Sequence, residues 1–407
     1  MGFLGPGRGH TFIVKIAING IGIAGPTVAY WLRRFGHEPV LFEKAAALRS
    51  GGYLIDFWGL GYAVAERMGI LANLRARGYE MRWMRMVARD GREEARVDLS
   101  PVRKALHGRF ISIARSDFAR ALFEACDGIP ARFGVSIAGI ERHEAGSVAA
   151  LSDGTREHFD VIVGADGLHS DVRALAFGPE ARFERFLDCY IAAFRVRGYR
   201  QRDELTYVSH TMRRRQVARV SLRDDETLVL FVWRPEDTGA DAPRCGEEQR
   251  AAVRRAFGDM GWETPELLGA MEHAIDFYFD RVSQIHMPRW SAGTVVLLGD
   301  AVACPSLLAG EGTGLAMLEA YVLAGELHRA NSDTPRAFAA YERRLRRLVT
   351  ARQDSAAWFR GFFAPETTLG LAVRSLAVHA FGLPFVAKPL VARSLRDDLE
   401  LPEYAAT

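Results

Sequence analysis

The sequence lacks any arrangement of cysteines that would build a disulfide or zinc framework. Its 407 residues include only four cysteines, which are far apart, form no CxxC pair and have no histidines at zinc-finger spacing. A small secreted disulfide scaffold and a zinc-finger protein are therefore excluded, and we expect no metal and a reducing, cytoplasmic location. The four are Cys126, Cys189, Cys245 and Cys304.

Long uncharged apolar runs are also missing. The most hydrophobic late segment, residues 369–392, is interrupted by Arg374, Pro384 and Lys388, whereas a membrane-spanning helix needs about 20 consecutive apolar residues. Residues 1–14 have no basic stretch ahead of an apolar core, so they predict a flexible leader and not a signal peptide. We therefore expect no membrane partner.

Neither sign of charge dominates the chain. It has 53 Lys and Arg against 50 Asp and Glu, a net charge of +3, which argues against a nucleic-acid-binding protein. The Arg-rich run 341–352 keeps helical spacing and is interpreted as a solvated helix face. With 49% hydrophobic residues, the chain can bury a sizeable core in one large or two ordinary domains.

What the sequence does have is a glycine-rich turn between two apolar strands. Residues 15–44 predict a strand, an amphipathic helix and a second strand, with Gly20, Gly22 and Gly25 spaced as G-x-G-x-x-G. Such glycines allow a tight turn, the approach of a pyrophosphate and close helix packing, and the helix N-terminus supplies free N–H groups. Glu43, at the end of the second strand, can accept hydrogen bonds from ribose hydroxyls. The motif predicts a bound dinucleotide, and by itself it leaves FAD and an NAD-like ligand both open.

In two later segments, a predicted strand is followed by glycine and aspartate. Residues 159–177 predict a buried strand, a turn containing Asp166 and a helix. Taken alone, this pattern also fits an ordinary turn with an Asx cap. Residues 294–298 predict a further strand, which runs into Gly299 and Asp300.

The three motifs together resemble the class A flavin-dependent monooxygenases, the para-hydroxybenzoate hydroxylase family. The GxGxxG turn, "GADGLHSDVR" at 164–173 and "GDA" at 299–301 match the three signatures of that family in order and approximate spacing. The stretch "CPSLLAGEGTGLAMLEAYVLAGEL" is most similar to the smaller members. These are the tetracycline-inactivating and natural-product tailoring monooxygenases, which work in antibiotic inactivation or biosynthesis.

The resemblance implies that FAD is the bound cofactor. The GxGxxG glycines and Glu43 would hold its ADP part, and Asp300 would contact the ribityl chain. Arg115, in the strand-to-helix segment 111–122, would also contact FAD, although it could simply precede a helix capped by Ser116. The predicted cofactor-binding residues are Gly20, Gly22, Gly25, Glu43, Lys44, Arg49, Arg115, Asp166, Gly299, Asp300, Gly312, Thr313 and Gly314.

The resemblance also implies an α/β fold, in which a Rossmann-like FAD-binding domain is interleaved with an antiparallel substrate sheet and followed by C-terminal helices. We assign residues 15–180 and 281–350 to the FAD-binding domain, with small insertions of the substrate domain near residues 80–100. Residues 181–280 would form the substrate-binding sheet. Residues 351–407 would cap the site or pack against a partner, in a monomer or a homodimer.

Alternating apolar residues between positions 187 and 233 predict the antiparallel sheet directly. A sheet that covers the cofactor would leave a ligand cavity between domains. His210 is interpreted as an exposed strand residue. Four aromatic residues are weak candidates for substrate contact, with plain core packing as the alternative. They are Tyr190, Phe194, Phe231 and Trp233.

The chemistry implied by the resemblance uses NADPH or NADH, bound transiently, to reduce the flavin. O2 then forms a C4a-hydroperoxide that oxygenates an aromatic or polyketide-like small molecule. Because the cofactor carries the chemistry, no obligatory acid or base residue is expected. The helix start at Gly310 and Gly312 would stabilise the reduced flavin, and Pro305 with Leu307 and Leu308 would exclude water.

The sequence leaves the roles of some residues and the exact reaction undecided. Arg49, beside Gly51 and Gly52, would guide phosphates of NAD(P)H or FAD, and Cys304 is expected to be buried and inert. A reductase or dehydrogenase of the same fold without oxygen insertion, and a non-catalytic flavin-binding protein, are the alternative functions. A flavin-dependent halogenase is disfavoured because the sequence has no WxWxIP segment.

Overall fold

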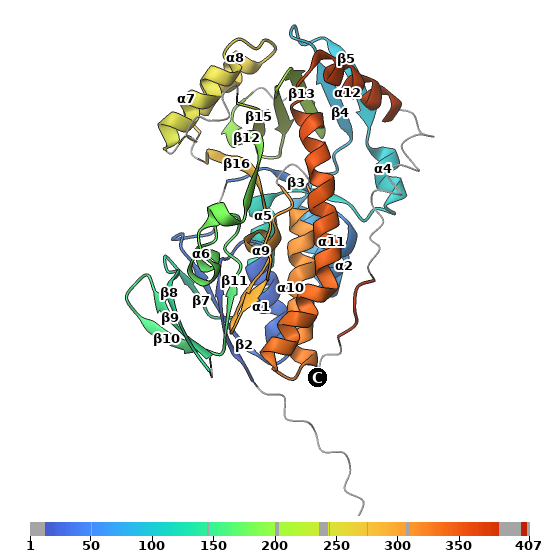
Figure 1. The fold of residues 1–407 in the computed structure, drawn as a ribbon. Helices are drawn as coiled ribbons and strands as arrows, with labels where there is room; N and C mark the ends of the chain where they lie inside the picture. Colours follow the sequence, from blue (N-terminus) through green and yellow to red (C-terminus); the bar gives the residue numbers. More distant parts are fainter. Residues whose placement is uncertain are drawn as a thin grey trace, which may run out of the picture.

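The computed structural model consists of two main sheets joined by long helices (Figure 1). A six-stranded sheet with α1 and α10 forms one half, and a seven-stranded sheet with α7 and α8 forms the other. Helix α11 (Thr334–Phe363) runs along both halves and contacts α10 and β12. The structure describes residues 13–49, 51–144, 146–199, 203–235, 243, 245–274, 276–306, 310–381 and 400–404.

The six-stranded sheet is parallel except for one short edge strand, and its order is β17-β18-β11-β1-β2-β7. Strand β1 lies between β2 and β11. The strand order therefore reverses at β1, with β2 on one side of it and β11 on the other. A crevice for a ligand forms at such a switch point, outside the carboxyl ends of the strands. The strands are β1 (Lys15–Asn19), β2 (Glu38–Glu43), β7 (Ala131–Phe133), β11 (Val161–Gly164), β17 (Ser291–Ala292) and β18 (Val295–Leu297).

Neighbouring residues of β1 show what covers each face of this sheet. The Ile18 side chain faces α1 (Ala24–Arg34), near Gly25, and α1 packs in turn on α10 (Gly312–Arg329). The next side chain, Asn19, points to the other face and accepts a hydrogen bond from the N–H of Ile137. That face carries a three-stranded sheet of β8 (Ile137–His143), β9 (Gly146–Leu151) and β10 (Arg156–Phe159).

The seven-stranded sheet has the order β16-β12-β15-β14-β13-β4-β5 and is largely antiparallel. Helices α7 (Gly246–Phe257) and α8 (Thr264–Met271) cover one face with an aromatic core, and α12 (Thr368–Phe381) packs on β5. The strands are β4 (Trp83–Val87), β5 (Glu93–Asp98), β12 (Glu184–Arg197), β13 (Thr206–Met212), β14 (Arg215–Ser221), β15 (Glu226–Trp233) and β16 (Tyr278–Ile285).

Shorter elements complete the region around the parallel sheet. A two-stranded sheet pairs β3 with β6, and α2 packs against α10. These elements are β3 (Leu54–Phe57), α2 (Gly59–Arg67), α3 (Leu71–Arg77), α4 (Ser100–Ala105), β6 (Ile111–Ala114), α5 (Arg115–Glu124), α6 (Asp171–Phe177), η1 (Glu180–Arg182) and α9 (Asp300–Ala303).

The fold confirms the predicted α/β class and the antiparallel sheet, and corrects two local expectations. Val14, assigned to the leader, is buried, and its carbonyl accepts the N–H of Glu38. His210 is buried instead of exposed, and its Nδ1 lies 2.9 Å from the carbonyl oxygen of Val87 because β4 pairs beside β13. Residues 1–12 and 382–399 lie outside the described residues. Among the described helices, none is long and apolar enough to cross a membrane.

A buried carboxyl group supports the turn that follows β18. Glu319 of α10 is 1% exposed, and its Oε2 accepts the N–H of Gly299 at 2.6 Å. Gly299 has φ 64°, and a Cβ there would lie 3.1 Å from the Cβ of Ala24, so the turn requires glycine. Burial raises the pKa of Glu319 to about 8.

This raised pKa predicts a pH-dependent stability. Glu319 ionises near pH 4.5 in the unfolded chain and near pH 8 in the folded one. Its contribution is therefore complete below pH 4.5 and is lost as the pH rises to 8, at up to about 1.4 kcal/mol per pH unit. Glu319→Gln should make the free energy of unfolding depend less on pH between these pH values. Denaturant titration measures this dependence. Glu38→Gln, which removes an exposed carboxylate, is the control, and equal slopes in both variants would refute the assignment.

Candidate functional site

A cleft of about 550 Å³ opens at the carboxyl ends of the parallel strands. The segments after β1, β2, β11 and β18 line it from one side, and the start of β16 from the seven-stranded sheet lines it from the other. The cleft therefore lies at the switch point of the parallel sheet and at the junction of the two halves. Of the predicted residues it contains Gly20, Gly22, Glu43, Lys44, Arg49, Arg115, Asp166, Asp300, Gly310, Gly312 and Thr313.

The three glycines of the first motif have different surroundings. Gly20 has φ 110°, and a Cβ there would lie 2.4 Å from the carbonyl oxygen of Ala165. A Cβ on Gly25 would lie 1.9 Å from the carbonyl oxygen of Gly20, so Gly25 permits helix packing and does not line the cleft. A Cβ on Gly22 would point into the cleft, where Nη2 of Arg115 at 3.8 Å is the nearest atom. Gly22 thus leaves space for a ligand.

Glu43 lies beside this turn at the end of β2. Its Oε2 accepts the N–H of Ile21 and its Oε1 accepts the N–H of Ala45, each at 3.0 Å. Lys44, the next residue, is paired with Asp171 across 3.7 Å. The carboxylate of Glu43 is therefore held at the cleft, where it can accept further hydrogen bonds.

The Asp166 carboxylate is already engaged by protein donors. Its Oδ2 accepts the Asn19 amide and the N–H of Val172, each at 3.0 Å, and its Oδ1 accepts the Ser170 hydroxyl at 2.5 Å. Burial raises the pKa of Asp166, and these hydrogen bonds oppose that rise. Asp166 thus fastens β1 to the start of α6 as well as lining the cleft.

Arg115 and Asp300, which carry opposite charges, both line the cleft. Burial raises the pKa of Asp300, and the positive charge of Arg115 opposes that rise. Burial also raises the pKa of the Cys304 thiol well above its ordinary range, and its Sγ donates to the carbonyl oxygen of Ser283 at 3.6 Å. Cys304 is therefore a protonated thiol in the wall of the cleft.

The start of α10 closes the cleft on a third side. Gly310 has φ 69°, and the nearest described atom to a Cβ on Gly312 would be Oδ1 of Asp300, at 3.6 Å. Gly314 lies outside the cleft lining and packs against α2, because a Cβ on Gly61 would lie 2.4 Å from the Cα of Gly314. Gly314 thus permits close packing of two helices.

Sequence reasoning missed the polar residues at the other end of the cleft. His169 lies between Glu180 and Asp280, with Nδ1 2.9 Å and Nε2 3.1 Å from their carboxylate oxygens. These hydrogen bonds raise the pKa of His169 to about 10. Tyr278 donates to Asp280 at 2.9 Å, and its ring centroid lies 6.0 Å from that of Tyr53. Only His169 carried a signal, as part of the second motif.

The structure corrects the predicted substrate residues. The four aromatic candidates lie on the face of the seven-stranded sheet that α7 and α8 cover. The Phe257 ring of α7 lies 4.7 Å from that of Phe231 and 5.7 Å from that of Trp233. They form core and do not line the cleft, because the strand alternation turns them away from it. The four are Tyr190, Phe194, Phe231 and Trp233.

Pro305 and Gly299 are also absent from the cleft wall. Pro305 is buried, and its carbonyl oxygen accepts the Gln284 amide at 2.9 Å. Cys304 and Ser306, on either side of it, line the cleft instead. Leu307 and Leu308, expected in the apolar wall, lie outside the described residues.

The donors around the cleft suit an elongated anion. Helices α1 and α10 both begin at the cleft, and neither N-terminus has a side-chain cap or an acidic residue in its first turn. Such ends present free N–H groups and positive dipoles. Arg115 and Arg49 add positive charge, and the space beside Gly22 lets a phosphate approach the backbone.

Comparisons with known proteins agree with this geometry. The family model for the FAD binding domain matches residues 14–355. The chain is 34% identical to a flavin-dependent monooxygenase of Legionella longbeachae over 403 residues, which cover 97% of this chain and 99% of the relative.

Solved structures show the same architecture. Tetracycline destructase Tet(51) superposes with a TM-score of 0.83 at 30% identity, over 97% of this chain and 100% of that chain. Klebsiella pneumoniae HpxO, complexed with FAD and uric acid, shares the fold with a TM-score of 0.77 at 19% identity, over 95% of this chain and 98% of that chain. The chain therefore belongs to the FAD binding domain family, among the class A flavin-dependent monooxygenases.

Proposed function

We propose that this monooxygenase uses NADPH or NADH and O2 to oxygenate an aromatic or polyketide-like small molecule. The observation that supports this most directly is the convergence of Gly22, Glu43, Arg115 and Asp300 on one cleft beneath two uncapped helix N-termini. The similarity to a tetracycline destructase favours a fused-ring substrate.

The residues of the cleft fit FAD. The N-terminus of α1 and Arg115 would neutralise its diphosphate, and Glu43 would accept hydrogen bonds from ribose hydroxyls. Asp300 would contact the ribityl chain. When bound, the flavin supplies the redox and oxygen chemistry.

The chain's own residues would position the reactants and exclude water. The N-terminus of α10, at Gly312 and Thr313, would stabilise negative charge on the reduced ring. Cys304 and Ser306 would form part of the wall that keeps water from the reacting centre. Because the pKa of Cys304 is raised, its thiol stays protonated and takes no part as a nucleophile.

We place the substrate where the seven-stranded sheet meets the cleft. Phe277 and Tyr278, near the start of β16, line the cleft together with Tyr53, and aromatic rings there can pack on a planar substrate. Residues 181–280 would thus form most of the substrate-binding part. In this assignment α12 caps the seven-stranded sheet, consistent with the packing of α12 on β5.

The decisive experiment follows isotopically labelled O2. In the presence of FAD, NADPH and a panel of fused-ring phenols, we expect substrate-stimulated NADPH oxidation and one labelled oxygen atom in the product. A reductase of the same fold would oxidise NADPH without labelling the product. A non-catalytic flavin-binding protein would show neither result.

Removing the central cation should weaken FAD binding. We expect Arg115→Gln to raise the dissociation constant of FAD by about tenfold or more, because a charge-assisted hydrogen bond to phosphate is lost. Flavin fluorescence titration of the apoprotein measures this change. Arg120→Gln, on the exposed side of the same helix, should leave the constant unchanged, and an equal effect of both variants would contradict the role of Arg115.

A substitution that fills the space at the start of α10 should weaken FAD binding without lowering the thermal stability of the protein. Among the described residues, the methyl group of Gly312→Ala meets no protein atom closer than Oδ1 of Asp300, at 3.6 Å, so the thermal midpoint should hold or rise slightly, since alanine favours helix. We expect weaker FAD binding and more hydrogen peroxide released per NADPH oxidised. Gly269→Ala in α8, which also has open space, is the matched control. Unchanged FAD affinity and peroxide release in Gly312→Ala would rule out ligand contact at this position.

A further inference from the structure

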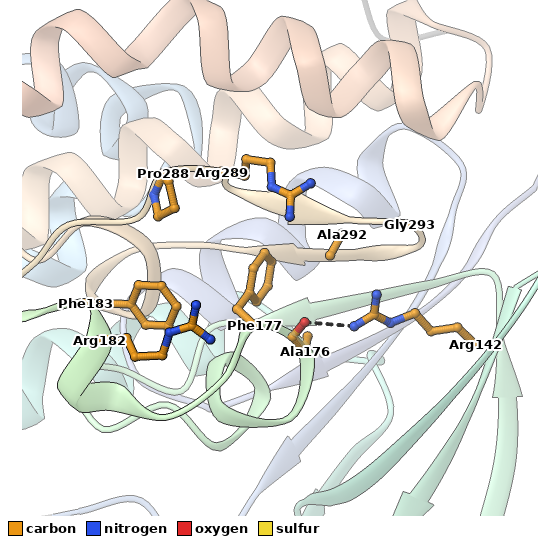
Figure 2. Close-up of a pocket in the computed structure, with 9 residues that line it drawn as sticks. All are labelled: Arg142, Ala176, Phe177, Arg182, Phe183, Pro288, Arg289, Ala292 and Gly293. Carbon is orange, nitrogen blue, oxygen red and sulfur yellow. Dashed lines mark hydrogen bonds between the residues drawn. The ribbon is translucent and has the colours of Figure 1, made fainter.

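A second cavity, of about 330 Å³, lies apart from the cleft and has a basic lining. Figure 2 shows it between the α6–η1 segment and the segment that leads into β17, with the Phe177 ring between the Arg182 and Arg289 side chains. Arg142 of β8 borders it on the side of Gly293. Three arginines therefore share one small pocket, which we call the basic pocket.

These three arginines share one pocket, and none of them has an acidic partner among the described residues. Within the described part of the chain, none of Arg142, Arg182 and Arg289 forms an ion pair, whereas the neighbouring Arg173 and Arg346 each pair with a glutamate. Arg142 donates only to the carbonyl oxygen of Ala176, at 2.8 Å. Guanidinium groups that share a concave site repel one another, and a bound anion relieves that repulsion.

Neighbouring residues fix the positions of two of these arginines. Arg142 is held by the last turn of α6 through its hydrogen bond, and its Cδ passes 3.8 Å from the position of a Cβ on Gly293. Arg182 lies beside Gly178, where a Cβ would come within 3.0 Å of its Nη1. Gly178 has φ 112° and leaves this room. The guanidinium of Arg182 also lies 5.8 Å from the Phe183 ring centroid.

The pocket offers apolar surface next to the charges. Phe177 is half-buried and Phe183 is 9% exposed, and Pro288 and Ala292 complete the lining. An aromatic face beside guanidinium groups suits a ligand that carries both a planar base and a phosphate, because bases stack on rings and arginine binds phosphate in a bidentate manner.

A short link connects the basic pocket to the cleft. Arg182 is the last residue of η1, and Glu180, the first, lies 2.9 Å from Nδ1 of His169 at the cleft. The Glu180 carboxylate also accepts from Arg173 at 2.6 Å. Because two cations already neutralise Glu180, it does not cancel the charge of the pocket.

We propose that the basic pocket binds the phosphorylated adenosine end of a nucleotide and that this nucleotide is NADPH. The GxGxxG unit of this chain lies at the FAD cleft, so a reductant needs a different place for its adenosine. Three unpaired guanidinium groups favour the 2′-phosphate, which NADH lacks. The identity of the nucleotide rests on the proposed function, whereas binding of a phosphorylated adenosine by the pocket does not.

A binding experiment tests the pocket itself. Adenosine 2′,5′-bisphosphate is titrated calorimetrically into the FAD-loaded enzyme and into the double variant Arg182→Gln/Arg289→Gln. Both side chains are exposed, and Arg142 is kept because it holds the end of α6. We expect the dissociation constant to rise by about tenfold or more in the double variant. Arg255→Gln on the exposed side of α7 is the matched control and should change nothing.

Titrations with other phosphate compounds test whether the pocket recognises a nucleotide or phosphate alone. Inorganic phosphate and 5′-AMP should bind more weakly than the bisphosphate, and equal binding of inorganic phosphate would overturn the nucleotide assignment. No bisphosphate binding, or equal binding by the wild type and the double variant, would overturn the site. Flavin absorbance of the double variant should match the wild type, which separates this pocket from the cleft.

Steady-state kinetics test the link to NADPH. In the double variant we expect the KM for NADPH to rise by about tenfold or more, with kcat and the KM for NADH unchanged. Normal NADPH kinetics in the double variant would refute this proposal while leaving the monooxygenase function intact. If the wild type oxidises neither NADPH nor NADH, yet the double variant binds the bisphosphate more weakly than the wild type does, the proposed function and the choice of NADPH fail, whereas the anion site stands.

Discussion

The Asp166 carboxylate holds together the segments from which the cleft is built. It accepts hydrogen bonds from Asn19 at the end of β1 and from Ser170 and Val172 at the start of α6. Asn19 in turn accepts from Ile137, so the sheet behind β1 joins the same network. The three hydrogen bonds to Asp166 are partly buried, where an unsatisfied carboxylate would be costly. The position of the glycine turn therefore depends on a side chain about 150 residues away in the chain.

Glycine serves two different purposes around this cleft. Gly22 and Gly312 leave open space at the cleft, Gly25 and Gly314 let backbones approach one another, and Gly299 makes room for the Ala24 side chain. The three glycines between residues 310 and 314 thus separate into two that line the cleft and one that lets α10 pack on α2. Spacing alone does not distinguish these purposes, because both leave the same residue in the sequence.

Around the cleft, cationic side chains lie where they could contact a ligand, and acidic side chains are neutralised. Arg115 and Asp300 both line the cleft, and His169, with its pKa raised to about 10, lies between two carboxylates at the edge. Glu319, which has no cation beside it, instead retains its proton up to about pH 8. The arginines of the basic pocket are the opposite case, because none of them forms an ion pair with an acid among the described residues, and the proposal of an anion site rests on that difference.

The sequence by itself determined the family, the α/β class and the strand ends at which the cleft opens. Strand ends, tight turns and helix starts are local features, and the carboxyl ends of parallel strands meet at one edge, so residues such as Gly20, Glu43 and Asp166 could be placed together. Only the tertiary structure decided which face of the seven-stranded sheet meets the cleft. A strand shows its alternation in the sequence but not which side α7 and α8 cover, so Tyr190 became core and Tyr278 reached the cleft.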